Sequence, residues 1–434
     1  MSRLQTVAAL RAAAHRARAP ASSGPSPGAR DVVKIALFAF NMGRGGVTTF
    51  ALDLGAFLTT AGHSVSVVTC EQGGWWPRLV ESGLSGICVP SRRWESATSY
   101  VRRLADHFVA ERYDAVLVNI GVLARPAMLG IHRWPEAVAA VPVLHNDLPR
   151  VYSLAMLNRR AWNVAVAVSP AVQLRASALL PGKPVIHIPN GIRLPEEDDL
   201  RRRAGWSLPL RLLFVGRLSD ATKGVLRLPE IVRECRLREV PVQLTVIGGG
   251  RDRSRLEEKA VACGVAEQIA LVGECSAEEV HDAMKSHHAL LFPSNIEGFP
   301  LVLVEAQANG CVPIASRLAG ITDLAIKDGS TGYLAEASDA AAFAGHVARL
   351  ADSTHWQALS AAGISRARRL FSLELMGTRY LGLIEALARG GYPLEVPRSK
   401  VARAGGPSLP LRDYLPNPVR RAAGRWVRRF RARP

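Results

Sequence analysis

The stretch Ser294-Asn-Ile-Glu-Gly-Phe-Pro-Leu-Val-Leu-Val-Glu-Ala-Gln-Ala-Asn-Gly310 decides the fold of this chain. Residues 288–293, directly before it, form an apolar run that is too short for a helix and predicts a strand buried on both faces. Pro300 then stands at a suitable first position of an amphipathic helix, and Gly310 lies just past its end. The stretch therefore predicts a strand, a tight loop and a helix N-terminus at the carboxyl edge of a parallel sheet.

This loop predicts an anion site. The backbone N–H groups from Gly298 to Val302 would be free at the helix N-terminus, where the helix dipole favours negative charge. A phosphate is the simplest guest for such a site. Because a phosphate repels carboxylates, we interpret Glu297 and Glu305, which bracket the site, as acceptors for neutral hydroxyl groups. A nucleotide-sugar offers such hydroxyls on its ribose and on its hexose.

The two glutamates stand in a distinctive context, Ser-x-x-Glu-Gly-Phe-Pro, with Val312-Pro-Ile-Ala-Ser316 downstream. This context resembles the signature of the retaining glycosyltransferases of family 4 (group 1), and the resemblance covers about residues 33–390. It implies the GT-B fold, an α/β fold of two doubly wound Rossmann-like domains that face each other across a cleft. The alternative is a solvated loop glutamate followed by a helix-surface glutamate.

The resemblance also implies roles for the residues of this loop. Glu297 would act in catalysis and, together with the loop amides, hold the donor sugar and phosphate. Glu305 would hold the ribose. The expected donor-binding residues of this segment are therefore Gly298, Phe299, Pro300, Leu301 and Glu305.

Two cations are expected at the same sheet edge. Arg217 follows a strand predicted over residues 211–218, and Lys223 opens the next helix. By composition alone both would be solvated surface residues. The resemblance implies instead that they are catalytic and bind the leaving diphosphate, whose negative charge grows as the sugar–phosphate bond breaks. No Asp-x-Asp motif in a strand context and no His/Cys cluster with ligand spacing occurs, so we expect no obligatory metal and no cofactor.

A second glycine-rich loop follows the first predicted strand, residues 32–40. Its sequence, Asn41-Met-Gly-Arg-Gly-Gly46, precedes a helix that extends to about residue 61. Gly43-x-Gly45-x-x-Thr48 nearly matches a dinucleotide fingerprint, which makes a dinucleotide-dependent oxidoreductase the first alternative. Thr48 departs from that pattern. The family resemblance implies that Gly45 and Gly46 face the acceptor and the donor phosphates.

Strand-like and helical segments continue to alternate through the N-terminal half, which predicts a doubly wound parallel sheet. Further strands are expected at residues 64–69, 86–90, 114–119, 139–144, 164–169 and 185–189. His145 directly follows one of them and is therefore expected at the ligand-binding edge. The resemblance places a catalytic histidine near the donor sugar here. A histidine satisfied by structural hydrogen bonds is the equal alternative.

These segments predict a division of the chain into five parts. The turn Pro189-Asn-Gly-Ile192 marks the expected crossing between two domains. The expected parts are a disordered basic extension at 1–30, an acceptor-binding Rossmann-like domain at 31–190, a nucleotide-sugar-binding Rossmann-like domain at 191–372, a closing helix at 373–390 and a basic tail at 391–434.

The net charge of +18 is concentrated at the two ends of the chain. Residues 1–30 contribute +5 and residues 396–434 contribute +10, so the body is nearly neutral at about +3. A near-neutral body offers no basic groove, so we expect no nucleic-acid partner. The six cysteines are scattered without a Cys-x-x-Cys pair, and we interpret them as buried thiols in a reducing compartment rather than as disulfides or zinc ligands.

The C-terminal tail predicts contact with a membrane surface. Between Val419 and Phe430, apolar residues recur at helical spacing while arginines fill the opposite face. Such a helix binds reversibly to an anionic bilayer. The alternative is a solvated or disordered tail, because Gly424 weakens the helix and short helices are marginal in water. No apolar run approaches the roughly eighteen residues of a membrane-spanning helix. We therefore expect a cytoplasmic protein that binds peripherally to the inner face of the cell membrane.

The leading functional hypothesis is a metal-independent, retaining hexosyltransferase. Its partners would be a nucleoside-diphosphate sugar (UDP- or GDP-linked) and a glycan or lipid-linked acceptor. The alternatives are the dinucleotide-dependent oxidoreductase, which the first glycine loop supports, and a non-catalytic membrane or nucleic-acid adaptor, which the two basic ends support.

Overall fold

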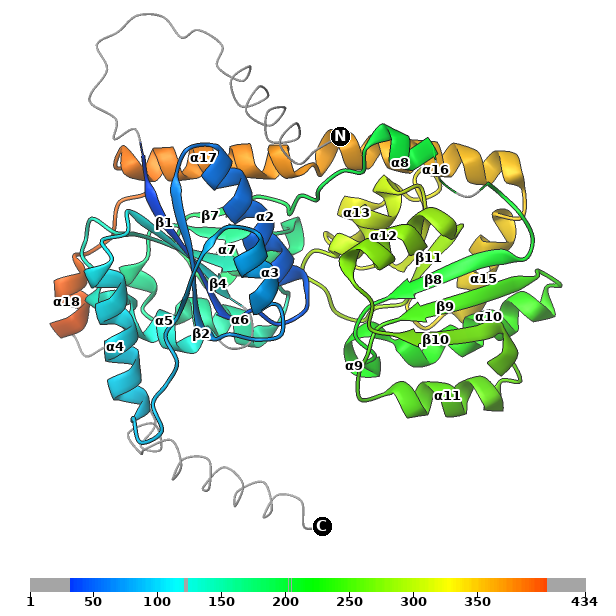
Figure 1. Ribbon diagram of the computed structural model, residues 1–434, viewed down its shortest axis with the longest axis horizontal. Coiled ribbons are helices and arrows are strands. Elements are labelled where there is room, and N and C mark those ends of the chain that lie inside the picture. The colour runs from blue at the N-terminus through cyan, green and yellow to red at the C-terminus, as the bar shows by residue number, and fades with distance from the viewer. Residues whose placement is uncertain (1–31, 121–123, 202, 204, 404–434) are drawn as a thin grey trace, which may run out of the picture. The chain divides into compact units, whose positions relative to one another are not determined.

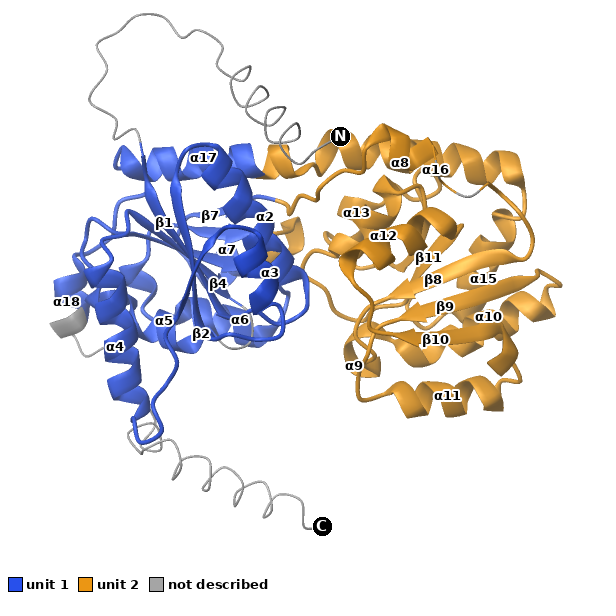
Figure 2. Ribbon diagram, viewed as in Figure 1, with its two compact units in different colours: residues 1–167, 173–188, 377–434 blue, residues 168–172, 189–376 orange. Residues whose placement is uncertain are grey.

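The computed structural model describes residues 32–120, 124–201, 203 and 205–403. The expected basic extension at 1–30 and the amphipathic helix expected between Val419 and Phe430 lie outside the described residues. Two compact units divide the described chain (Figure 2). Unit 1 takes in residues up to 167, 173–188 and the residues from 377 onward, and unit 2 takes in residues 168–172 and 189–376. The chain therefore changes unit at 167–168, 172–173, 188–189 and 376–377, whereas the sequence predicted boundaries at 190–191 and 372–373.

Unit 1 is built on a seven-stranded parallel sheet of order β3-β2-β1-β4-β5-β6-β7. Strands β1, β4 and β5 are buried almost throughout, as a parallel sheet covered on both faces requires. The order reverses between β1 and β4, the position at which doubly wound sheets bind their ligands. The strands are β1 (Lys34–Asn41), β2 (Ser64–Glu71), β3 (Ser85–Cys88), β4 (Ala115–Ile120), β5 (Ala139–Leu144), β6 (Ala165–Ala167) and β7 (Val185–His187).

Helices connect these strands and cover the sheet of unit 1 (Figure 1). Most expected strands of this half are confirmed within one or two residues, because short apolar runs bounded by Gly, Pro or Asn are strong local signals. The helices are α2 (Gly46–Thr60), α3 (Trp76–Glu81), α4 (Ala97–Ala110), α5 (Arg125–Gly130), α6 (Pro149–Met156), α7 (Pro170–Leu179), α17 (Leu373–Ala388) and α18 (Arg398–Arg403), with 3-10 turns η1 (Ile131–Arg133) and η2 (Arg159–Ala161).

Unit 2 contains a six-stranded parallel sheet of order β10-β9-β8-β11-β12-β13, which reverses between β8 and β11. One strand, β13, was not expected from the sequence, because its three residues at the sheet edge are too few to display a period. The strands are β8 (Leu210–Val215), β9 (Val242–Ile247), β10 (Ile269–Gly273), β11 (Ala289–Phe292), β12 (Val312–Ser316) and β13 (Tyr333–Ala335).

Two groups of helices cover this second sheet. Helices α10, α11 and α15 pack together, and α12, α13 and α16 form the other group (Figure 1). The bounds are α8 (Glu197–Arg201), α9 (Asp220–Lys223), η3 (Val225–Arg227), α10 (Leu228–Leu237), α11 (Arg253–Ala262), η4 (Ala266–Gln268), α12 (Ala277–Ser286), α13 (Leu301–Ala308), α14 (Thr322–Ala325), α15 (Ala340–Arg349) and α16 (Ser353–Leu370). The α/β class with two doubly wound parallel sheets is therefore confirmed.

The helix after the deciding loop differs from the expectation in one respect. The sequence suggested an amphipathic helix, yet six of the eight residues of α13 are buried. The reason is that α16, whose position the local sequence cannot reveal, packs over α13. The end of the helix is as expected, because Gly310 adopts a left-handed conformation (φ 79°) just beyond the last turn.

The segment after α17 packs against unit 1. The sequence had grouped residues 391–403 with the basic tail. Arg398 is only 1% exposed, and its Nε and Nη1 donate to the carbonyls of Ala161 (2.8 Å) and Val138 (2.9 Å). Lys183 lies 3.5 Å from Glu395 in an ion pair. Buried, hydrogen-bonded cations of this kind fix the segment in place.

Two further observations bear on the expectations. All six cysteines are free thiols; four are buried as expected, whereas Cys88 and Cys275 are only half-buried. Within the ranges that the structure describes, none of the helices combines the length and the apolar character that crossing a bilayer requires.

Candidate active site

The candidate residues of unit 2 gather where its sheet order reverses. Strands β8 and β11 are parallel neighbours, paired at Leu212 with Ala289 and at Leu213 with Leu290. Their carboxyl ends therefore meet at one edge, which brings the loop containing Arg217 to the same edge as the loop containing Glu297. Ligands of doubly wound sheets bind at this kind of edge.

An ion pair joins the two loops. Lys223, the last residue of α9, places its Nζ 2.5 Å from Oε1 of Glu297. The Glu297 side chain is 9% exposed and that of Lys223 is 23% exposed, so water screens the pair only in part. The Lys223 ammonium also lies 5.0 Å from the ring centre of Phe292, the last residue of β11. Two residues that the sequence assigned to one site are therefore in contact.

Backbone contacts hold the two loops together around this pair. The Asn295 amide donates to the carbonyl of Thr222 (2.8 Å), and its side-chain Nδ2 donates to the carbonyl of Asp220 (3.0 Å). The Nη1 of Arg227 donates to the carbonyl of Pro293 (2.9 Å). The sequence analysis missed these positioning residues, because a loop asparagine and a surface arginine carry no distinguishing local signal.

Gly224 allows the close approach of the two loops. It has a left-handed backbone conformation (φ 60°), and a Cβ at this position would lie 2.1 Å from the carbonyl oxygen of Pro293. Position 224 therefore requires a glycine for two reasons, the left-handed backbone dihedral angle and the close approach of the Pro293 carbonyl. Similarly, a Cβ on Gly248 would lie 1.9 Å from the oxygen of Gly216, so the loops after β8 and β9 also meet through their backbones.

The helix N-terminus offers fewer amides than the sequence suggested. Pro300 is the N-cap of α13 rather than its first helical residue. The Leu301 amide donates to the carbonyl of Phe299 (3.1 Å) and is therefore engaged by the turn itself. The amides of Gly298, Phe299 and Val302 make no hydrogen bond to other described residues of unit 2.

The remaining expected residues of unit 2 occupy the same edge. Arg217 lies on the loop after β8 and is exposed to solvent. Glu305 lies in the second turn of α13 and is partly exposed. The helix carries it on the carboxyl side of β11, where the expected ribose contact requires it.

The glycine loop of unit 1 is closed by a threonine. The Thr48 hydroxyl donates to the carbonyl of Gly43 (2.5 Å), and the Thr48 side chain is buried. Gly45 is the N-cap of α2 with φ 145°, and the space next to its Cα is open. Gly46 is the first residue of α2. Thr48 thus stabilises the loop by this hydrogen bond. The dinucleotide fingerprint has instead a small residue at this position, which lets the helix pack closely.

His145 lies at the carboxyl edge of the same sheet. Its Nε2 is 2.8 Å from Oδ1 of Asn119, near the end of β4, and its ring meets that of Phe50 edge-on at a centroid distance of 4.8 Å. Burial lowers the pKa of His145 to about 3. The imidazole is therefore neutral near pH 7. The structure supports both proposed roles of this residue, since it is hydrogen-bonded and also at the ligand edge.

Two other parts of the molecule add no further site residues. Among the described residues, no group of three or more His, Cys, Asp or Glu side chains is arranged to hold a metal ion. An open depression of about 680 Å³ lies between α8 and α16 and contains none of the expected site residues. Its lining consists of Glu197, Leu200, Arg201, Ala361, Ile364, Ser365, Arg368 and Arg369.

Two Rossmann-like sheets, each with candidate ligand-binding residues where its strand order reverses, define a GT-B-type enzyme. Residues 44–195 match the family model described as Glycosyltransferase Family 4, and residues 197–368 match the model described as Glycosyl transferases group 1. The chain therefore belongs to the group 1 / family 4 glycosyltransferases. Membership in this family excludes the two alternative functions considered from the sequence, a dinucleotide-dependent oxidoreductase and a non-catalytic adaptor.

Individual relatives extend over most of the chain. The sequence is 26% identical to the phosphatidyl-myo-inositol mannosyltransferase of Mycobacterium leprae (strain TN), over 81% of this chain and 96% of the relative. Among solved structures, a glycosyltransferase from Rickettsia africae ESF-5 is 16% identical with a TM-score of 0.68, covering 83% of this chain and 99% of that one. Anabaena HepE in complex with UDP-glucose is 16% identical with a TM-score of 0.69, covering 81% and 99%. These structures share the fold.

Proposed function

We propose that this protein is a retaining hexosyltransferase that moves a hexose from a UDP- or GDP-linked donor to a glycan or lipid-linked acceptor. The observation that carries the proposal is the contact of Lys223 with Glu297 at the β8/β11 edge. A cation held by a carboxylate, beside the N-terminus of α13, suits a ligand that combines a diphosphate with a hydroxyl-bearing sugar.

Each group of unit 2 has a role in this proposal. The amides of Gly298, Phe299 and Val302 bind the diphosphate, and Lys223 with Arg217 stabilises the charge that it gains when it leaves. Glu297 accepts a hydrogen bond from a sugar hydroxyl in addition to the one that it accepts from Lys223. Glu305 accepts hydrogen bonds from the ribose.

The reaction needs no side-chain nucleophile. The acceptor hydroxyl attacks the anomeric carbon from the same face from which the leaving group departs. The C–O bond to the diphosphate breaks as the new glycosidic bond forms. The departing phosphate oxygen takes the hydroxyl proton, and the configuration is retained. The positive charges required are those of Arg217 and Lys223, so the proposal includes no obligatory metal and no cofactor.

Unit 1 holds the acceptor in this proposal. The open space beside Gly45 and Gly46 and the edge occupied by His145 are the candidate positions. The relatives support the substrate classes without fixing them. One relative is named a phosphatidyl-myo-inositol mannosyltransferase, and the HepE structure contains UDP-glucose.

We further propose a peripheral location at the cytoplasmic face of a membrane, which rests on the sequence of the C-terminal tail.

The direct test is incubation of the full-length protein with a panel of UDP- and GDP-sugars and with lipid and glycan extracts, while released UDP or GDP is measured. We expect release from one class of donor, accelerated by one class of acceptor. Treatment with EDTA should leave most of the activity; complete loss that magnesium restores would contradict the metal-free mechanism. Absence of release from every donor, together with binding of NAD(P), would contradict the transferase itself.

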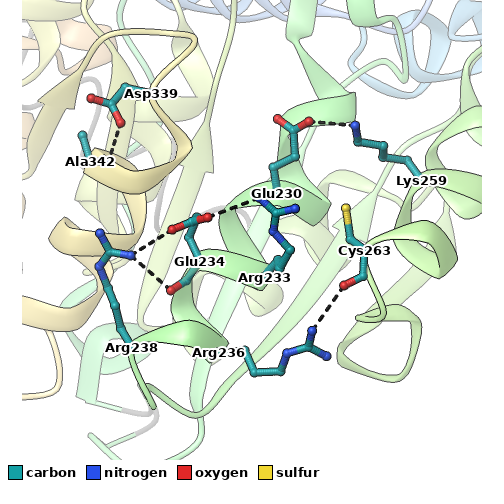
Figure 3. A network of polar contacts seen from close by, with 9 residues as sticks. All are labelled: Glu230, Arg233, Glu234, Arg236, Arg238, Lys259, Cys263, Asp339 and Ala342. Atoms are coloured by element: carbon teal, nitrogen blue, oxygen red, sulfur yellow. Dashed lines mark hydrogen bonds and ion pairs between the residues drawn. The ribbon is translucent and has the colours of Figure 1, made fainter.

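A matched control is available in unit 2. Lys259 on α11 forms a 2.8 Å ion pair with Glu230 on α10, within a network of surface charges (Figure 3). Glu234 in the same network contacts Arg233 (3.3 Å) and Arg238 (3.0 Å). Lys259→Ala removes a lysine–glutamate pair from the same unit and should leave the release of UDP or GDP unchanged.

A further inference from the structure

Asn119 is a residue that the sequence did not single out. It is the fifth residue of β4, is only 2% exposed, and pairs in register with Val143 of β5. His145 lies two positions beyond Val143. Because side chains two positions apart in a strand point to the same face, this register brings the Asn119 amide beneath the imidazole.

The contact between the two side chains fixes the tautomer of His145. In the orientation that the amide has here, the Asn119 Oδ1 oxygen faces the imidazole and can only accept, so the Nε2 of His145, 2.8 Å away, is assigned as the donor. A neutral imidazole that carries its proton on Nε2 has an unprotonated Nδ1. Within the described residues of unit 1, this Nδ1 makes no hydrogen bond, and the residue retains 7% exposure.

Aromatic neighbours restrict the rotation of this imidazole. Phe50 meets the His145 ring edge-on at 4.8 Å, and Tyr380 meets Phe50 at 5.5 Å. All three residues are buried. The ring therefore keeps one orientation, with Nε2 toward Asn119 and Nδ1 on its other side.

The Nδ2 group of Asn119 gives a reason to expect a functional role for this residue. Its Nδ2 is buried and has no hydrogen-bond partner among the residues that the structure describes. An unpaired buried N–H group is destabilising, and an apolar side chain at this strand position would avoid the cost. A role in purely structural stabilisation therefore explains Asn119 poorly, whereas the contact of its Oδ1 with His145 explains why an amide is present.

We propose that Asn119 is a positioning residue that holds neutral His145 as the Nε2–H tautomer, so that Nδ1 accepts a hydrogen bond from a substrate hydroxyl. This inference rests on the proposed glycosyl transfer for the identity of the substrate. The hydroxyl belongs either to the donor hexose or to the acceptor, and both present the same chemistry to Nδ1.

The tautomer can be measured without any assay of activity. In full-length protein labelled with ¹⁵N-histidine, two-bond ¹H–¹⁵N spectra near neutral pH distinguish the two tautomers, and His145→Gln identifies the resonances of His145. We expect the Nε2–H form in the wild type and in Asn119→Asp, which keeps an acceptor oxygen. We expect Asn119→Leu to lose this preference.

A buried asparagine in the same unit provides the control. The Asn163 Oδ1 accepts from the Ala140 amide (2.9 Å), and its Nδ2 donates to the Tyr392 carbonyl (3.0 Å), so Asn163→Leu should lower stability without changing the His145 tautomer. Both leucine variants are compared in thermal unfolding, so that loss of folding is separated from loss of positioning.

Activity measurements then identify the source of the hydroxyl. Loss of one neutral hydrogen bond predicts a decrease of about 3- to 10-fold in kcat/KM for Asn119→Leu, with partial rescue in Asn119→Asp. If the donor provides the hydroxyl, donor hydrolysis in the absence of acceptor falls too; if the acceptor provides it, only transfer falls. An Nδ1–H tautomer in the wild type, or an unchanged tautomer in Asn119→Leu, overturns the inference. Absence of any glycosyl transfer, with the tautomer as expected, would instead count against the proposed function.

Discussion

The Nζ of Lys223 lies 2.5 Å from Oε1 of Glu297, although 74 positions separate the two residues in the chain. The contact arises because α9 ends and the loop after β11 begins at the same edge of the sheet of unit 2. In the proposed transfer, Glu297 would hold the Lys223 ammonium in place, so that little reorganisation is needed when a diphosphate binds.

Removing the cation should therefore affect turnover more than donor binding. Lys223→Ala should lower kcat by a factor of about 10²–10³, because the charge on the leaving group grows towards the transition state. Steady-state kinetics of UDP or GDP release measures this change, with Lys259→Ala as control. A higher donor KM at unchanged kcat would show that Lys223 contributes only ground-state binding.

Glu305 should show the opposite pattern. A hydrogen bond to the ribose is present in both the ground state and the transition state, so Glu305→Ala should raise the donor KM more than it lowers kcat. Glu305→Gln, which keeps an acceptor oxygen, should restore part of the affinity. If kcat collapsed while the donor affinity stayed the same, the ribose assignment would be wrong.

Gly224 should be intolerant of any side chain. A Cβ would meet the Pro293 carbonyl at 2.1 Å, and the backbone dihedral is left-handed, so Gly224→Ala should separate the loops after β8 and β11. We expect a loss of about 1–3 kcal/mol in the free energy of unfolding, together with reduced activity. The control is Gly345→Ala on α15, where an added Cβ meets no neighbour within 4 Å. Equal stability of the two variants in urea unfolding would contradict the tight approach.

His145 should make the protein sensitive to acid. Burial lowers its pKa in the folded state to about 3 from the ordinary value of 6.5, so the unfolded chain binds the proton more readily. The contribution of His145 to stability is complete above about pH 6.5 and is lost, at about 1.4 kcal/mol per pH unit, as the pH falls towards 3. His145→Gln should therefore reduce the difference in urea midpoint between about pH 7 and pH 5. An unchanged difference would show that the imidazole is not buried in its neutral form.

The position of C-terminal truncation should decide whether unit 1 stays stable. Arg398 is buried and donates to the carbonyls of Ala161 and Val138. Removal of residues 396–434 strips those carbonyls of their donor, at about 1–3 kcal/mol for each unsatisfied group, whereas removal of residues 404–434 leaves the contacts intact. Thermal unfolding should show a lower Tm for the shorter chain only. Equal Tm values would show that the Arg398 contacts contribute little.

The truncation that removes only residues 404–434 is also the suitable variant for the membrane hypothesis. Removal of residues 404–434 deletes the segment from Val419 to Phe430 without disturbing the packed residues up to 403. Sedimentation with anionic vesicles at low salt should be lost while donor hydrolysis continues. Equal sedimentation of the two proteins would remove the main reason to favour a lipid-linked acceptor.

The sequence by itself determined most of the strands and the loop that carries the family motif. These depend on local properties: apolar runs of four to eight residues, and glycine or proline where the backbone turns. Gly298, Pro300 and Gly310 mark the loop and the helix without reference to any distant residue. The family motif is equally local, since Glu297 and Glu305 belong to one loop and one helix.

Only the tertiary structure decided which side chains meet. The Lys223–Glu297 pair and the Asn119–His145 hydrogen bond depend on strand order and register, which arise from long-range packing and leave no periodic trace in the sequence. The same holds for the cover of α16 over α13. The burial of Arg398 is a further case, because a charged residue in a basic segment is expected at the surface unless distant carbonyls receive it. Local sequence thus specifies the elements, while non-local burial and hydrogen bonding select the contacts among them.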